Sequence, residues 1–129
     1  AMPLYGHELS EAIDPYTAGL GFAVNLKDRE FLGSHFLARM KPAPRSQERI
    51  GLCLTGRRVP REGYPVVQDG EPVGTVTSGT FSPTLEKPIA MAYVRPQIGT
   101  PGTKVAIDIR GKHEPAEIVE LPFYQRTKE

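Results

Sequence analysis

Residues 64–78 read YPVVQDGEPVGTVTS, which is two apolar segments joined by an Asp-Gly pair. A two-residue type I′ turn needs positive φ at both central positions, and Asp and Gly tolerate that conformation. Asp69-Gly70 therefore predicts a β-hairpin whose strands run over 64–68 and 73–78. The hairpin indicates an antiparallel sheet as the basis of the fold.

Apolar residues alternate with other residues in three further segments, 49–55, 89–95 and 103–110. This period of two is typical of half-buried strands. A turn at Gly111-Lys112 would lead into a last strand over 116–121. The five or six short strands, separated by turn residues, predict a small antiparallel barrel or sandwich. The 13 prolines and 13 glycines among 129 residues argue against a long helical bundle.

The first 45 residues follow a different pattern. A short apolar run over 22–26 predicts a strand, and 29–40 is expected to be a helix with Asp28 as its N-cap. Pro42 and Pro44 would end that helix, because proline cannot donate a backbone hydrogen bond and crowds the preceding turn. The apolar face of the helix is expected to contain Phe31, Leu32, His35, Phe36 and Met40, with His35 as a packing residue.

Composition and charge exclude several classes of function. No apolar run approaches the ~18–20 residues that a membrane-spanning helix needs, and no signal peptide is visible, so a cytoplasmic location is expected. A single cysteine, Cys53, allows no disulfide within the chain and no cysteine-based zinc site. No pair of histidines has ligand spacing, so no metal site is expected. The 16 basic and 15 acidic residues favour neither nucleic acid nor an anionic membrane as a partner.

Two segments within the predicted barrel carry side chains that suit binding. Arg57 and Arg58, followed by Arg61, form a basic turn. That turn is either a solvated loop or a docking patch for an acidic partner or a phosphate-bearing ligand. The hydroxyl-rich run over 76–85 fits a tight barrel corner with Phe81 as its apolar plug, or else a polar loop that faces a ligand.

The C-terminal tail also has two interpretations. It either frays, as chain ends often do, or brings Tyr124, Arg126 or Lys128 over an adjacent pocket. A cation at the rim of such a pocket would suit a ligand that carries a carboxylate.

Four stretches carry a family resemblance, in the order in which that family has them: LYGHEL over 4–9, AGLGFAV over 18–24, VTSGTFSPTL over 76–85 and PFY over 122–124. The third stretch, followed by KPIAMAYV over 87–94, is the most specific. Together they resemble the C-terminal part of the aminomethyltransferases, the T-proteins of glycine cleavage systems. The resemblance covers essentially the whole chain, but only the last third or so of the family's protein.

The resemblance implies a tetrahydrofolate-dependent transferase. Such enzymes take an aminomethyl group from the lipoyl arm of H-protein, release ammonia and pass the one-carbon unit to tetrahydrofolate, giving methylene-tetrahydrofolate. Their last domain is a small six-stranded antiparallel barrel of Greek-key, jelly-roll-like form. Here that mainly β domain would occupy 46–129, preceded by a short strand and one helix. Residues 1–45 would be the end of the middle, folate-binding domain, and the upstream domains would be partners of the barrel.

The resemblance assigns few site residues to this chain. The family's catalytic aspartate and its main pterin-binding acid lie upstream, so no catalytic residue is expected here and the isolated chain is expected to be inactive. Tyr124 and Arg126 are expected to lie near the glutamate end of tetrahydrofolate, with Lys128 as the competing cation. Arg57 and Arg58 are candidates for docking H-protein. Two alternatives stay open: the barrel of a dimethylglycine- or sarcosine-type demethylating enzyme, and a stand-alone binding module without catalysis.

Overall fold

The predicted hairpin lies at the centre of the fold. In the computed structural model, which describes residues 1–126, Asp69 and Gly70 adopt φ values of 52° and 84°. They join strand β2 (Pro65–Gln68) to strand β3 (Glu71–Ser82) in an antiparallel pair. The type I′ turn and the hairpin are therefore confirmed.

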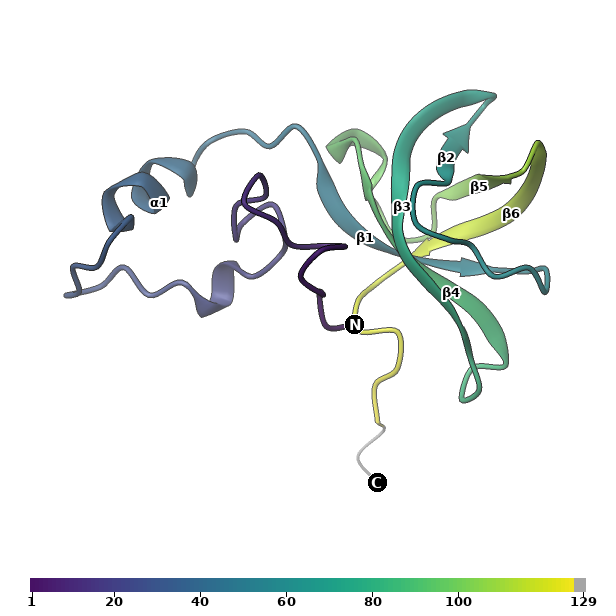
Figure 1. The fold of residues 1–129 in the computed structure, drawn as a ribbon, viewed down its shortest axis with the longest axis horizontal. Coiled ribbons are helices and arrows are strands. Elements are labelled where there is room, and N and C mark those ends of the chain that lie inside the picture. Colours follow the sequence, from purple (N-terminus) through teal and green to yellow (C-terminus); the bar gives the residue numbers. More distant parts are fainter. Residues whose placement is uncertain (127–129) are drawn as a thin grey trace.

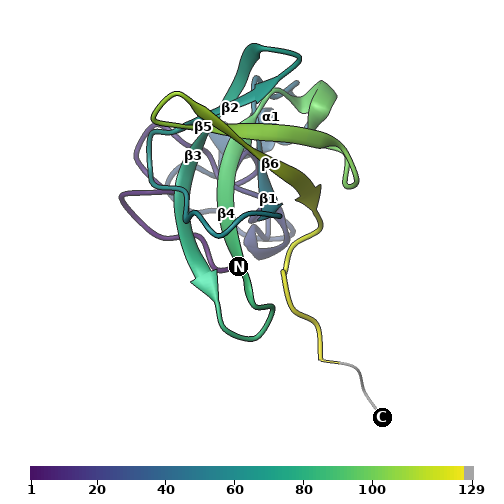
Figure 2. The same cartoon turned by 90° about the vertical axis from the view of Figure 1, so that its right-hand side faces the viewer.

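Six strands close into an antiparallel barrel in the order β1-β4-β3-β2-β5-β6 (Figures 1 and 2). The other strands are β1 (Glu48–Leu54), β4 (Lys87–Val94), β5 (Lys104–Ile109) and β6 (Lys112–Val119), and a short 3₁₀ helix, η2 (Pro96–Ile98), precedes β5. Strands β2, β3 and β4 form a meander, and β1 lies beside β4, which is a Greek-key arrangement. The six-stranded barrel expected from the sequence is confirmed.

The barrel interior is filled by the side chains that the period of two places on one face of each strand. In β4 the small residues Ala90 and Ala92 face the interior, whereas Met91 and Tyr93 are buried on the outer side. The outer side of β4 therefore lies under another part of the chain. The core consists of Ile50, Leu52, Leu54, Val66, Val73, Val76, Ala90, Ala92, Val94, Val105, Ile107, Ile109, Ala116 and Ile118.

Residues 1–45 form an arm of mostly irregular chain that extends from one side of the barrel, with helix α1 (Ser34–Met40) far from it (Figure 1). The helix predicted over 29–40 is wrong at its start. Gly33 has a φ of 91° and Asp28, the expected N-cap, has a φ of 53°. These left-handed conformations interrupt the chain before residue 34, so Asp28 caps nothing.

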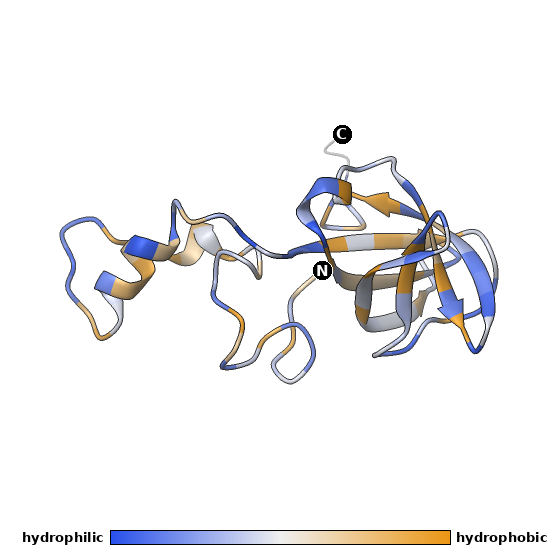
Figure 3. Cartoon of the chain, turned by 90° about the horizontal axis from the view of Figure 1, so that it is seen from above, coloured by the Kyte–Doolittle hydropathy of each residue, from blue (hydrophilic) through white to orange (hydrophobic). Residues whose placement is uncertain are grey.

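Apolar residues, orange in Figure 3, also occur in the part of the arm that extends away from the barrel. Phe31, Leu32 and Phe36 are exposed, and Leu32 is as accessible as in an extended peptide, at 104%. His35 is also exposed, so its predicted packing role is wrong within this part of the chain. Exposed apolar side chains that cluster at and just before a helix are typical of a surface that another piece of protein covers.

The strand predicted over 22–26 is wrong. A short 3₁₀ helix, η1 (Gly21–Ala23), replaces it, held by local bonds from the Ala23 and Val24 amides to the carbonyls of Leu20 and Gly21. Phe22 is 87% exposed, and no neighbouring strand pairs with this run in the described structure. Without a pairing partner, the apolar composition alone could not make a strand.

The barrel corner predicted over 76–85 is also wrong. Strand β3 continues to Ser82, which pairs with Lys87, and the turn lies after it, where Glu86 has a φ of 53°. Phe81 is 47% exposed and does not fill an apolar site.

Within residues 1–126, no helix is long and apolar enough to cross a membrane.

Candidate functional site

Glu8 is the one charged side chain that is fully buried among the described residues, with 0% exposure. One carboxylate oxygen accepts hydrogen bonds from the hydroxyls of Thr77 and Ser78, each at 2.6 Å. The other oxygen accepts the Leu4 amide at 2.9 Å. Burial raises the pKa of Glu8, but these hydrogen bonds and nearby His7 outweigh it and hold the pKa below its usual value.

Tyr93 of β4 binds the same segment through its main chain. Its hydroxyl donates to the Glu8 carbonyl at 2.8 Å. Burial raises the pKa of Tyr93, and the charges of Glu8 and Asp14 raise it further against the opposing effect of Arg49. The phenol therefore stays protonated at neutral pH and keeps its proton for this hydrogen bond.

Arg49 of β1 makes a second attachment between the arm and the barrel. Its Nε donates to the Ala18 carbonyl at 2.7 Å, and one Nη lies 3.2 Å from the sulfur of Met91. The turn that presents Ala18 is held by Asp14, whose carboxylate accepts the amides of Tyr16 and Thr17 at 2.9 and 3.1 Å. The group Glu8, Arg49, Thr77, Ser78 and Tyr93 is named the junction below.

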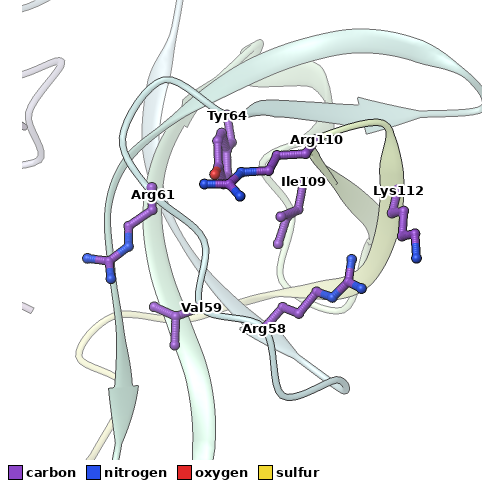
Figure 4. Close-up of a pocket in the computed structure, with 7 residues that line it drawn as sticks. All are labelled: Arg58, Val59, Arg61, Tyr64, Ile109, Arg110 and Lys112. Atoms are coloured by element: carbon purple, nitrogen blue, oxygen red, sulfur yellow. The ribbon is translucent and has the colours of Figure 1, made fainter.

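A second polar region lies at one end of the barrel (Figure 4). A hollow of about 470 Å³ has Val59, Tyr64 and Ile109 among its walls, and four cations complete its lining: Arg58, Arg61, Arg110 and Lys112. Figure 4 shows Arg58 and Lys112 on one side, Arg110 beside Tyr64, and Arg61 directed away from Ile109. This region is named the cationic hollow.

The structure gives the two docking candidates different surroundings. Arg57 and Arg58 are both exposed on the loop between β1 and β2, and Arg58 Nε lies 3.3 Å from Glu114 Oε1. Arg58 thus lines the same hollow as Arg110 and Lys112, which lie about fifty residues later in the sequence, at the turn from β5 to β6. A cationic surface of this kind suits an acidic partner.

The tail is seated on β1 up to Phe123. A Cβ added to Gly51 would lie 2.7 Å from Leu121 Cδ2 and 2.9 Å from Phe123 Cε1, so both side chains cover this glycine. Phe123 also lines a smaller hollow of about 260 Å³, together with Met2, Ser78, Thr80 and Met91 among others.

The two tail candidates do not line that hollow. Tyr124 is 58% exposed and directly follows the wall residue Phe123, and Arg126, two positions further along the chain, is also exposed. Lys128 lies outside the described residues. The structure therefore places a pocket beside the tail, while the expected contacts of Tyr124 and Arg126 with a ligand stay a prediction.

Several of these residues were not singled out by the sequence. Glu8 and Thr77 lie 69 positions apart, and nothing in their spacing predicts a contact. Both lie in stretches that carry the family resemblance, which was the one available signal. Arg110 and Lys112 lie at a predicted turn about fifty residues from Arg58 in the sequence, and only the closure of the barrel brings them near it.

No group of three or more His, Cys, Asp or Glu side chains suited to a metal ion occurs within residues 1–126.

Comparison with known proteins assigns the family. Residues 47–125 match the model of the glycine cleavage T-protein C-terminal barrel domain. The aminomethyltransferase of Streptomyces coelicolor is 54% identical over 98% of this chain and 36% of its own length, and that of Symbiobacterium thermophilum is 50% identical over 96% and 33%. A crystal structure of glycine cleavage system aminomethyltransferase T from Bartonella henselae matches 95% of this chain and 35% of that chain, with a TM-score of 0.85 and 32% identity.

This chain spans about a third of the length of the curated relatives that it matches. The match runs through the barrel and its tail, and the similarity to the relatives extends over the arm as well. On these grounds the chain belongs to the aminomethyltransferase family of glycine cleavage T-proteins, and it contains that family's C-terminal barrel domain.

Proposed function

We propose that this chain is the C-terminal part of a tetrahydrofolate-dependent aminomethyltransferase. The whole enzyme takes the aminomethyl group from lipoylated H-protein, releases ammonia and forms methylene-tetrahydrofolate in glycine cleavage. The observation that carries the proposal is the 54% identity to an aminomethyltransferase across nearly the entire chain, arm and barrel alike. Residues 1–45 would end the middle domain and 46–129 would form the barrel domain.

The exposed apolar face of the arm supports this division. Phe22, Leu32 and Phe36 are 87%, 104% and 54% exposed in the described chain, which is costly for a domain that exists alone. An upstream domain that covers this face would bury it. The chemistry would then reside upstream, and the carboxylate of Glu8 in the described junction is buried and already accepts three hydrogen bonds.

The tail supplies groups that fit one end of tetrahydrofolate. The Arg126 guanidinium is exposed and suits the glutamate carboxylates of the folate, with Tyr124 beside it. The adjoining hollow is largely apolar and has the hydroxyls of Ser78 and Thr80 in its lining. These residues would hold and orient the folate tail, and the bound tetrahydrofolate would supply the acceptor for the one-carbon unit.

The cationic hollow is the proposed docking surface for H-protein on this chain. Arg58 and Arg61 come from one loop, and Arg110 and Lys112 from another, so the hollow is lined by four cations; Arg57 is exposed and directly precedes Arg58. Charges on such a rim speed association and fix orientation more than they add affinity. Arg57→Glu and Arg110→Glu are expected to slow binding of H-protein about tenfold at low salt, whereas Lys27→Glu on the arm should leave it unchanged.

The experiment that tests the proposed function starts from the gene. The reading frame that encodes this chain is expressed from its own start codon and assayed with aminomethylated H-protein and tetrahydrofolate. Formation of methylene-tetrahydrofolate and ammonia is expected from the whole protein and not from the chain described here. A reading frame without an upstream folate-binding segment, or a whole protein that turns over neither substrate, would contradict the proposal.

A further inference from the structure

Glu8 joins the arm to two strands of the barrel at once. Its side chain reaches Thr77 and Ser78 of β3, and its carbonyl accepts the hydroxyl of Tyr93 on β4. The same carboxylate accepts the Leu4 amide, which closes the loop 4–9 on itself. Further bonds to the Leu4 carbonyl, from the amides of residues 7–9, hold this loop in one shape. A single buried side chain therefore organises both the loop and its attachment.

A β-bulge makes this attachment possible. Successive side chains of a regular strand point to opposite faces, so Thr77 and Ser78 could not normally bind the same atom. The register of β3 with β4 shifts here: Val76 pairs with Ala92 and Ser78 pairs with Met91, which leaves Thr77 as the extra residue. Bulges turn side chains away from their regular direction, and this one brings both hydroxyls to Glu8 Oε1.

Carboxylate is the group that this geometry requires. Two hydroxyls and one amide converge on Glu8, and all three act as donors toward it. An amide side chain in the same place would offer one acceptor oxygen and would turn an N–H toward the Leu4 N–H. Thr77 Oγ1 also lies 3.0 Å from the Met91 carbonyl, so its single proton has a second acceptor available.

We infer that Glu8 is a positioning residue, which sets the orientation of the upstream part of the protein against the barrel through the bulged Thr77-Ser78 pair. The arm is fastened to the barrel at Glu8 and, on the opposite side of β4, at Arg49 through the Ala18 carbonyl. The consequence for catalysis rests on the proposed function. A whole enzyme that loses this attachment would hold its folate site and its barrel tail at a variable angle, which weakens folate binding.

The first measurement uses the whole protein and follows the peptides that belong to this chain. Glu8→Gln is compared with Glu11→Gln, which removes an exposed carboxylate from the same segment. Amide hydrogen exchange in residues 4–9 is expected to become about 10- to 100-fold faster in Glu8→Gln, because a charge-assisted bond is lost. Exchange in the interior strands should accelerate much less than exchange in residues 4–9, and Glu11→Gln should change neither region. Unchanged exchange in residues 4–9 of Glu8→Gln would overturn the inference.

The second measurement uses the whole protein and separates positioning from mere stability. In Glu8→Gln the KM for tetrahydrofolate is expected to rise at least fivefold, whereas a variant that is only less stable would lose active enzyme at unchanged KM. Thr77→Val should reproduce part of the rise and Thr77→Ser, which keeps the hydroxyl, should not. Faster exchange in residues 4–9 with an unchanged KM would overturn the positioning role. An inactive wild-type protein would instead contradict the proposed function, and the exchange measurement would still test the attachment.

Discussion

Gly79 of β3 lies directly beneath the loop that carries the arginines of the cationic hollow. A Cβ at this position would lie 2.3 Å from the carbonyl oxygen of Pro60 and 3.1 Å from its carbonyl carbon, and Cβ atoms essentially never approach closer than 3.0 Å. Pro60 is fully buried, so the loop cannot simply lift. Gly79→Ala is therefore expected to force backbone movement of at least about 0.7 Å at this contact.

The size of the effect follows from two opposing contributions. Overpacking of this kind costs about 1–3 kcal/mol of the free energy of unfolding. Replacement of glycine by alanine returns about 0.4–1 kcal/mol, because the unfolded chain has fewer conformations. The net loss is roughly 1–2 kcal/mol, which lowers the melting temperature by about 3–8 °C in a domain of this size.

Urea and thermal unfolding monitored by circular dichroism measure this loss. Gly56→Ala is the matched control on the same loop, because its added Cβ meets only the carboxylate end of Glu114, at 2.6 Å, which can swing aside. The control should change the free energy of unfolding by less than about 0.5 kcal/mol. Equal stabilities of the two variants would refute the reasoning that the Pro60 backbone fixes glycine at position 79.

Other perturbations test other parts of the structure. Leu52→Ala empties a fully buried site in the barrel and should cost about 2–5 kcal/mol in urea unfolding. Although burial raises the pKa of Glu8, its hydrogen bonds lower it below 4.5, so its contribution to stability is present above about pH 4.5 and is lost as pH falls through the folded-state pKa. Acid titration of unfolding should therefore destabilise the wild type more than Glu8→Gln. Arg126→Ala should leave the melting temperature unchanged but weaken tetrahydrofolate binding by the whole enzyme in calorimetry, whereas Phe123→Ala, which uncovers Gly51, should lower the melting temperature.

The parts of the fold that local chemistry determines could be predicted from the sequence. Asp69-Gly70 specifies its own turn, because few residues tolerate positive φ at both positions. The alternation of Ile50, Leu52 and Leu54 likewise reports burial on one face of a strand. These signals lie within a few residues of each other, so no knowledge of the rest of the molecule was needed.

Features set by distant partners could not be predicted in the same way. The apolar run at Phe22 has strand composition but no strand to pair with, and α1 starts late because Gly33 adopts a left-handed conformation that composition does not reveal. The junction depends on a one-residue register shift at Thr77, which no pattern in the sequence marks. Glu8 and Glu11 look alike in sequence, and only the folded chain separates the buried carboxylate from the exposed one.

The order of the strands has a consequence for protein synthesis. Of the six barrel strands, β1 leaves the ribosome first. Its two neighbours in the barrel are β4 and β6, and β6 also pairs with β5. The seam of the barrel thus stays open until Val119 has been made, with unpaired backbone on both β1 and β5. Open edges of apolar strands invite pairing with other chains. Nascent or truncated chains that end before Val119 are accordingly expected to be the aggregation-prone forms of this protein.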